Sequence, residues 1–269
     1  MAIITISRGS YSRGKEVAGK VAKKLGYDCI SRDILLDASE MFKIPEIKLI
    51  SAIEDSPSIL DRFNNGKERY VAFIQAALLK YLKEDNIVYH GFAGHFFVKD
   101  IAQVLKVRII ADMEERVRLE MIRENVSEEK AVRTIIKNDE QRRKWSLFLY
   151  GIDTSESNLY DLVIHIRTMN ADDAADIICD AASHDCFQTT CESRKRIEDL
   201  ALAAEVKATL MDLSPYVEAS AENGTVNIRA KMHEYGNADM ELRLKNLAES
   251  INGVKEANIR VFPVTQFTD

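Results

Sequence analysis

A short apolar run at residues 2–6, rich in β-branched side chains, is followed by a polar loop and then by a helical pattern. The run is too short for a helix, so it predicts a buried strand. After the loop, Val17, Val21 and Leu25 recur at the spacing of one helix face, and Gly26 predicts where that helix ends. This succession of strand, loop and helix constrains the fold more than any other feature, because it is typical of the opening of a parallel α/β sheet.

The same alternation continues along the chain. With only 11 Gly and 4 Pro in 269 residues, long helices are favoured over a turn-rich all-β fold. Residues 31–85 are predicted to be mostly helical. Alternating strands and helices predict a parallel sheet. Apolar runs predict strands at 87–89, 105–110 and 162–166, and helical spacing predicts helices near 67–83, 95–103, 113–150 and 171–182.

The pattern changes after residue 183. Residues 183–195 are polar and predict a linker, and a helix is expected at 196–211. Alternating residues on both sides of Asn223-Gly224 predict a β-hairpin. A helix at 237–250 and a strand at 254–261 complete an αββαβ order. We therefore expect one domain at 1–187 and a second at 196–269, joined by a linker at 188–195.

The loop after the first strand has the spacing Gly9-x4-Gly14-Lys15, which matches a Walker A motif up to its last position. Its glycines let successive N–H groups face phosphate oxygens, and the following helix adds partial positive charge. An ordinary glycine turn that caps a helix is the alternative interpretation. The position between a buried strand and an amphipathic helix favours phosphate binding. The residues expected to hold the phosphates are Gly9, Ser10, Tyr11, Ser12, Arg13, Gly14, Lys15 and Glu16.

Glu16 occupies the position at which a Walker A motif carries the Ser or Thr that holds Mg²⁺. A carboxylate is itself a hard oxygen ligand, so Glu16 is a candidate metal ligand. The same carboxylate could instead repel the γ-phosphate.

Arginines recur in the charged helical stretch from Asp112 to Arg143. Most such runs are solvated helix faces, and neighbouring glutamates support that interpretation here. Phosphoryl transfer, however, needs cations that close over the γ-phosphate, and arginine meets phosphate oxygens bidentately. The candidate catalytic residues are therefore two of these arginines, Arg116 and Arg142, together with Lys15 of the loop. Together these features predict a P-loop NTPase parallel sheet with a helical lid, plus a small α+β C-terminal domain.

Charge and cysteine content exclude several other classes. The chain has 37 basic and 43 acidic residues and a net charge of −6, which disfavours broad nucleic-acid binding. No apolar run is long enough for a transmembrane helix, and the N-terminal residues lack an export signal. The four cysteines form no CxxC pair, which is typical of reduced thiols. We expect a cytoplasmic protein.

The run ITISRGSYSRGKEVAGKVAKKLGYDCISRDIL resembles the opening of the cytidylate kinase-like family. The family typically has Ser-Arg before the loop, which is Ser7-Arg8 here. It has a Gly-Gly-Arg-Glu-like end of the loop, where this chain has Arg13-Gly14-Lys15-Glu16. It also has an Asp-Arg or Arg-Asp pair after the first helix, which is Arg32-Asp33 here. Four more segments extend the resemblance to about residues 2–182, namely VYHGFAGHFF, ADMEERVRLEM, NDEQRRKWSLFLYG and NLYDLVIHIRTMNADDAADII.

The resemblance implies an ATP-dependent phosphotransferase that uses Mg²⁺ and transfers the γ-phosphoryl group to a nucleoside monophosphate or another small phosphorylated acceptor. Its expected acceptor-binding residues are Arg32, Asp33, Arg62 and Arg123. The family usually has Gly-Arg-Gly-Ala where this chain has Gly91-Phe92-Ala93-Gly94. The missing arginine and Glu16 leave open an alternative, a nucleotide-binding regulatory protein with little or no turnover.

The C-terminal αββαβ pattern resembles a BON domain. The matching segments are 203–210, the Asn223-Gly224 hairpin and 251–254. Such domains are usually regarded as binding modules, so the resemblance implies a protein or membrane-surface partner and no chemistry of its own.

Overall fold

The computed structural model describes residues 2–9, 12–31, 38, 66–91, 94–214, 216–232 and 238–263. These residues form two compact units, each described by itself below. The sheet unit contains described residues of 2–31 and 84–193, and the C-terminal unit contains 38, 66–83 and 194–263. Within the described part of the chain, no helix is both long and apolar enough to cross a bilayer.

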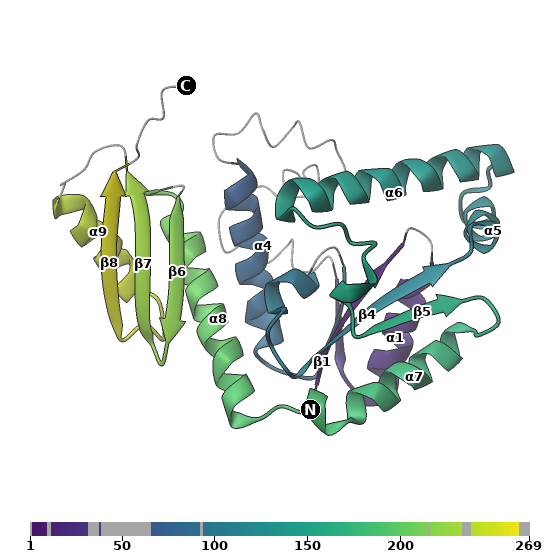
Figure 1. Cartoon of the computed structure of the whole chain (residues 1–269), viewed down its shortest axis with the longest axis horizontal. Helices are drawn as coiled ribbons and strands as arrows, with labels where there is room; N and C mark the ends of the chain where they lie inside the picture. The colour runs from purple at the N-terminus through teal and green to yellow at the C-terminus, as the bar shows by residue number, and fades with distance from the viewer. Residues whose placement is uncertain are drawn as a thin grey trace. The chain divides into compact units, whose positions relative to one another are not determined.

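The sheet unit is built on five parallel strands in the order β2-β3-β1-β4-β5. The first strand therefore lies in the centre, and both of its neighbours come later in the chain. Of these strands, β1, β4 and β5 are labelled in Figure 1. The expected parallel α/β sheet is confirmed. The strands are β1 (Ile3–Arg8), β2 (Asp28–Ile30), β3 (Ile87–His90), β4 (Val104–Ala111) and β5 (Leu162–Ile166).

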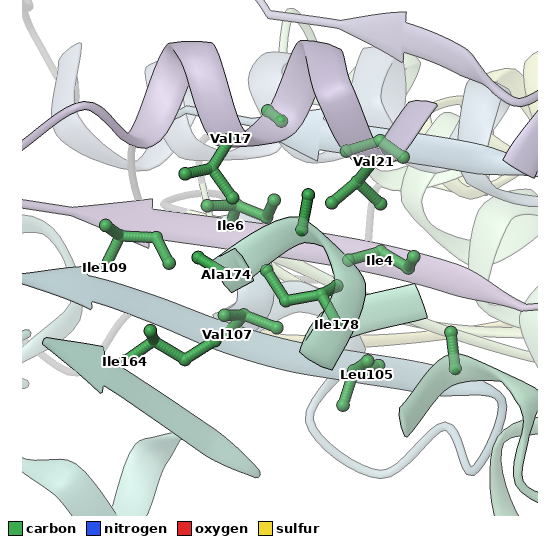
Figure 2. Packing of buried hydrophobic residues seen from close by; sticks show 14 of the residues in the cluster. Ile4, Ile6, Val17, Val21, Leu105, Val107, Ile109, Ile164, Ala174 and Ile178 are labelled. Atoms are coloured by element: carbon green, nitrogen blue, oxygen red, sulfur yellow. The ribbon is translucent and has the colours of Figure 1, made fainter. Parts of the chain in front are cut away.

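Two helices cover one face of this sheet. They are α1 (Gly14–Leu25) and α7 (Ala171–Ser183). Apolar side chains of both helices pack with side chains from β1, β4 and β5, and this cluster is the core of the unit (Figure 2). The labelled members are Ile4, Ile6, Val17, Val21, Leu105, Val107, Ile109, Ile164, Ala174 and Ile178.

The helical stretch expected at 113–150 connects β4 to β5 and consists of two helices. This helical pair is α5 (Met113–Glu124) and α6 (Glu128–Tyr150). Ser127 caps α6 by accepting a hydrogen bond from the backbone N–H of Lys130 at 3.4 Å. Val117, Ala131 and Ile135 form a small buried cluster between the two helices. The short 3-10 helix η3 (Ser157–Leu159) lies between α6 and β5.

The expected helix over 95–103 is wrong. The chain there forms a 3-10 helix, η2 (Gly94–Val98), and continues in tight turns in which Ile101 N donates to Val98 O at 3.3 Å and Val104 N donates to Ile101 O at 3.2 Å. Bonds between residues three apart are typical of short connectors. Here they lead directly into β4, which leaves no room for a regular helix.

The C-terminal unit has the expected αββαβ order. Its three-stranded sheet has the order β6-β7-β8, with β6 and β7 antiparallel and β7 and β8 parallel. Asn223 and Gly224, with φ of 56° and 89°, form the predicted hairpin turn. The elements are α8 (Cys191–Leu210), β6 (Val217–Glu222), β7 (Thr225–Met232), α9 (Ala238–Glu249) and β8 (Glu256–Pro263). The helix α4 (Gly66–Leu82) groups with this unit, and its Arg69 forms an ion pair with Asp212.

The helix α8 begins five residues before the expected start at Arg196, so part of the predicted linker is helical. A reciprocal cap explains the earlier start. Ser193 N donates to Thr190 Oγ1 at 3.1 Å, and Thr190 N donates to Ser193 Oγ at 3.0 Å. These bonds satisfy backbone donors that the first helical turn cannot pair internally.

A short 3-10 helix, η4 (Asp185–Phe187), follows α7.

Candidate phosphate-binding site

The loop after β1 is fixed to the neighbouring strand β4. Gly9 N donates to Ile109 O on β4 at 3.3 Å. The Ser12 hydroxyl is fully buried and lies 2.9 Å from Gly9 O and 3.1 Å from Ile109 O. Ser12 thus connects both ends of the loop to the carboxyl edge of the sheet, where ligands bind in open α/β folds.

Gly14 begins α1 in a space that leaves no room for a side chain. A Cβ atom at this position would lie 2.8 Å from the Cβ and 2.9 Å from the Cδ of Arg8. Arg13, just before it, has φ of 62°, a left-handed conformation that is uncommon for residues other than glycine. The loop end is therefore closely fitted against β1.

Lys15 is exposed in the first turn of α1. It forms no ion pair with any residue that the structure describes. A helix start offers free N–H groups and partial positive charge, so Lys15 adds a full charge where an anion is already favoured.

Glu16 uses both carboxylate oxygens to bind Arg13. The Nε and Nη2 atoms of Arg13 donate to Glu16 at 2.8 and 3.2 Å. Lys20 lies 4.0 Å from Glu16 and 2.7 Å from Asp172 at the start of α7. Among the described residues, no group of three or more His, Cys, Asp or Glu side chains could hold a metal ion.

The arginines of the helical pair differ in their surroundings. Arg116 is 9% exposed and lies 2.5 Å from Asp139, which connects α5 to α6. Arg123 pairs with the buried Glu120 at 2.9 Å, and Arg142 lies on α6. The solvated-face interpretation fits Arg118 and Arg133, which pair with the neighbouring Glu115 and Glu129.

The helix α5 begins close enough to the loop for their charges to interact. The hydrogen bond from Arg118 lowers the pKa of Glu115, and the charge of Arg13 lowers that pKa further.

Five other candidate residues lie outside the described part of the chain, as does the Phe92 departure from the family pattern. They are Ser10, Tyr11, Arg32, Asp33 and Arg62.

Sequence reasoning missed a polar cluster beside the loop. Tyr160, before β5, donates from its hydroxyl to Thr154 O at 2.9 Å and lies 3.1 Å from Ser7 Oγ on β1. Arg108 on β4 donates to the same hydroxyl at 3.2 Å. The ring of His95 lies 4.9 Å from that of Tyr160. The available signal was Lys106 and Arg108, two cations at alternate positions of an otherwise apolar strand.

His95 in this cluster makes stability depend on pH. It is 4% exposed, and burial, helped by the charges of Arg108 and Lys106, lowers its pKa to about 3. Between about pH 3 and 6.5 the unfolded chain then binds more protons at His95 than the folded chain, so stability rises with pH in this window. His95 contributes at most about 1.4 kcal/mol per pH unit to this slope.

We expect His95→Gln to flatten this pH dependence. The measurement is the urea midpoint between pH 4 and 7, followed by the fluorescence of Trp145, the single tryptophan of the chain. Asp153 is a second source of acid sensitivity at lower pH. Hydrogen bonds, first from the backbone of Ser155, lower its pKa to about 2. A variant that keeps the full slope between pH 4 and 6.5 would contradict the assignment to His95.

Comparison with known proteins gives the family. Residues 3–168 match the model of the cytidylate kinase-like family. The chain belongs to the cytidylate kinase-like family. The cytidylate kinase of Sulfurisphaera tokodaii is 34% identical over 178 residues, which are 65% of this chain and 92% of that protein. The cytidylate kinase of Sulfolobus acidocaldarius is 27% identical over 176 residues, which are 64% of this chain and 90% of that protein.

A solved structure has the same fold as this family member. An uncharacterized protein from Eubacterium ventriosum aligns with a TM-score of 0.53 and 21% identity, over 68% of this chain and all of that one. The match to the cytidylate kinase-like family ends at residue 168. It includes the loop, the helical pair and all five strands of the large sheet, and it does not include the small sheet.

Proposed function

We propose that this protein is an ATP-dependent phosphotransferase that transfers the γ-phosphoryl group to a nucleoside monophosphate. The observation that carries the proposal is Lys15, which lies exposed and without a described ion pair at the start of α1. In the loop before it, Ser12 donates to backbone carbonyls of the loop and of β4, and Gly14 packs closely against Arg8. Family membership and the named cytidylate kinases support the choice of reaction.

The loop suits a polyphosphate. Its two ends are held on β1 and β4, and Gly14 keeps the backbone close to Arg8. Backbone N–H groups at such a start, together with a lysine, are the groups that bind phosphates in P-loop proteins. In the proposal, residues 9–16 hold the donor phosphates, and Lys15 binds the β- and γ-phosphate oxygens as a point charge.

Mg²⁺ fits the donor chemistry of Glu16, because this cation takes carboxylate and phosphate oxygens together. When bound, it would neutralise charge on the phosphates. Both Glu16 oxygens hold Arg13 in the structure. Each carboxylate oxygen has a second lone pair, so Glu16 could hold the ion beside Arg13, and opening of the ion pair would free the Arg13 guanidinium for phosphate.

The remaining proposed roles concern the transferred group and the acceptor. Arg116 and Arg142 stabilise the charge that spreads over the transferred phosphoryl oxygens. Arg123, Arg32, Asp33 and Arg62 position the acceptor. No strong general base is required, because the acceptor phosphate is already an anion and positioning accounts for most of the rate.

The direct test is ADP release from ATP and Mg²⁺ in the presence of each nucleoside monophosphate in turn. We expect turnover with at least one pyrimidine monophosphate, with CMP first among them. Tight ATP binding without turnover for any monophosphate would refute the phosphotransferase proposal. It would favour a nucleotide-binding regulatory protein, in which Glu16 stays paired with Arg13.

For the C-terminal unit we propose a BON-like binding module with a protein or membrane-surface partner. The αββαβ order and the Asn223-Gly224 turn support this proposal. In this proposal the domains are residues 1–187 and 196–269, and α4 is a part of the first range that groups with the C-terminal unit.

A further inference from the structure

Arg108 lies on β4 beside the anchoring point of the phosphate loop. It pairs in register with Ser7 of β1, and its neighbour Ile109 provides the carbonyl that holds Gly9 and Ser12. Side chains alternate between the two faces of a strand. Because Ile109 belongs to the core under α1 and α7, Arg108 projects from the opposite face.

One edge of the Arg108 guanidinium is fixed by neutral groups. Its Nη1 atom donates to Thr154 O and to the Tyr160 hydroxyl. The guanidinium carbon also lies 5.5 Å from the centre of the Tyr160 ring, in a cation–π arrangement. The side chain is therefore held in one orientation before any ligand arrives.

The other edge of the same guanidinium is unused. Among the residues that the structure describes, no group accepts from Nε or Nη2 of Arg108, and no carboxylate forms an ion pair with it. The side chain is half-buried. A charge that has lost part of its hydration and has no counter-charge favours binding of an anion.

A second unmet hydrogen-bonding group lies in the same cluster. The Nε2 atom of His95 is buried and has no hydrogen-bond partner, although buried polar atoms are rarely left unpaired. The His95 ring packs against Tyr160, the residue that holds Arg108. The cluster thus offers a fixed cation and an unpaired polar nitrogen next to the loop.

We propose that the Nε–Nη2 edge of Arg108 binds the phosphate of the acceptor as a bidentate contact. This inference rests on the proposed function and adds a residue that determines acceptor affinity. Guanidinium edges match the geometry of phosphate oxygens. The acceptor is favoured over the donor because the donor contacts belong to the loop and to α1, whereas Arg108 projects from the opposite face of the sheet.

The test compares Arg108→Gln and Arg108→Lys with Lys106→Gln. Arg108→Gln removes both the charge and the paired N–H donors of the guanidinium, whereas Arg108→Lys keeps the charge alone. Lys106→Gln is the matched control, because it removes an equal charge two residues earlier on the same face of β4. Calorimetric titrations with CMP, with inorganic phosphate and with ATP give separate affinities for the acceptor, for a bare oxyanion and for the donor.

We expect Arg108→Gln to weaken CMP binding about 10- to 100-fold, the usual effect of losing charge-assisted hydrogen bonds. ATP affinity should stay within about twofold of wild type. Arg108→Lys should recover part of the loss, and Lys106→Gln should match wild type.

Unchanged CMP affinity in Arg108→Gln would overturn the inference. An equal loss for CMP and ATP would also overturn it, because that result indicates a structural role. The ADP-release assay on the wild type separates this inference from the proposed function. CMP binding that depends on Arg108, without turnover, would support the Arg108 site and refute phosphotransfer. Turnover in the wild type, with unaltered CMP affinity in Arg108→Gln, would support phosphotransfer and overturn the Arg108 site.

Discussion

Lys15→Ala should lower the rate of phosphotransfer by about 10² to 10³, the usual effect of removing one fixed group that stabilises transition-state charge. The structure gives the reason. Lys15 is exposed at the start of α1 and forms no ion pair with a described residue. Its loss therefore breaks no described ion pair within the protein and removes a charge that is available to the nucleotide. The measurement is kcat and kcat/KM for ATP with the best monophosphate.

Lys23→Ala is the matched control for this variant. Lys23 lies exposed near the other end of the same helix, so its replacement changes the net charge equally at a place remote from the loop. We expect wild-type kinetics from it. Activity that survives in Lys15→Ala at more than about a tenth of the wild-type rate would remove the main support for the proposed function.

Gly14→Ala should reduce ATP affinity by about tenfold or more and also destabilise the sheet unit by about 1–3 kcal/mol, because the new methyl group overlaps a packed neighbour. The Cβ would lie 2.8 Å from the Cβ of Arg8, an atom close to the backbone that cannot move aside freely. Either β1 or the loop must shift, and the loop is also bound to β4 through Ser12.

Gly19→Ala separates this overlap from the general effect of replacing a glycine. Gly19 lies on α1, and a Cβ there would meet nothing within 4 Å. In a helix interior, alanine is favoured over glycine by about 0.5–1 kcal/mol. We therefore expect Gly19→Ala to gain stability and keep ATP affinity. Urea midpoints and ATP titrations of the two variants give the comparison, and similar behaviour of both would contradict the proposed fit at Gly14.

Local patterns predicted the sheet unit well because each one is governed by neighbours in the sequence. The strand at 162–166 and the helix at 171–182 depend on short-range periodicity, and the structure confirms both. The start of α8 was missed because Thr190 and Ser193 form a less usual cap, in which serine takes the place of the acidic residue.

Contacts between distant segments could not be predicted in this way. Asp139 lies 23 residues from Arg116, and their pairing depends on how α5 packs against α6. Arg108 is a comparable case. Its sequence position indicated only a charged residue in a strand, and its fixed guanidinium edge emerges once Thr154 and Tyr160 fold back beside β4.

The sheet order also affects how the protein avoids unwanted association. The strands at the two ends of the large sheet are β2 and β5, and outer strands with unpaired backbone groups can recruit other chains into aggregates. The strand β2 is three residues long, which gives an incoming strand little backbone to extend. At the end of β5, Asp112 contacts His165 and forms an ion pair with the following Arg167, and charged residues at a sheet edge resist continued strand addition.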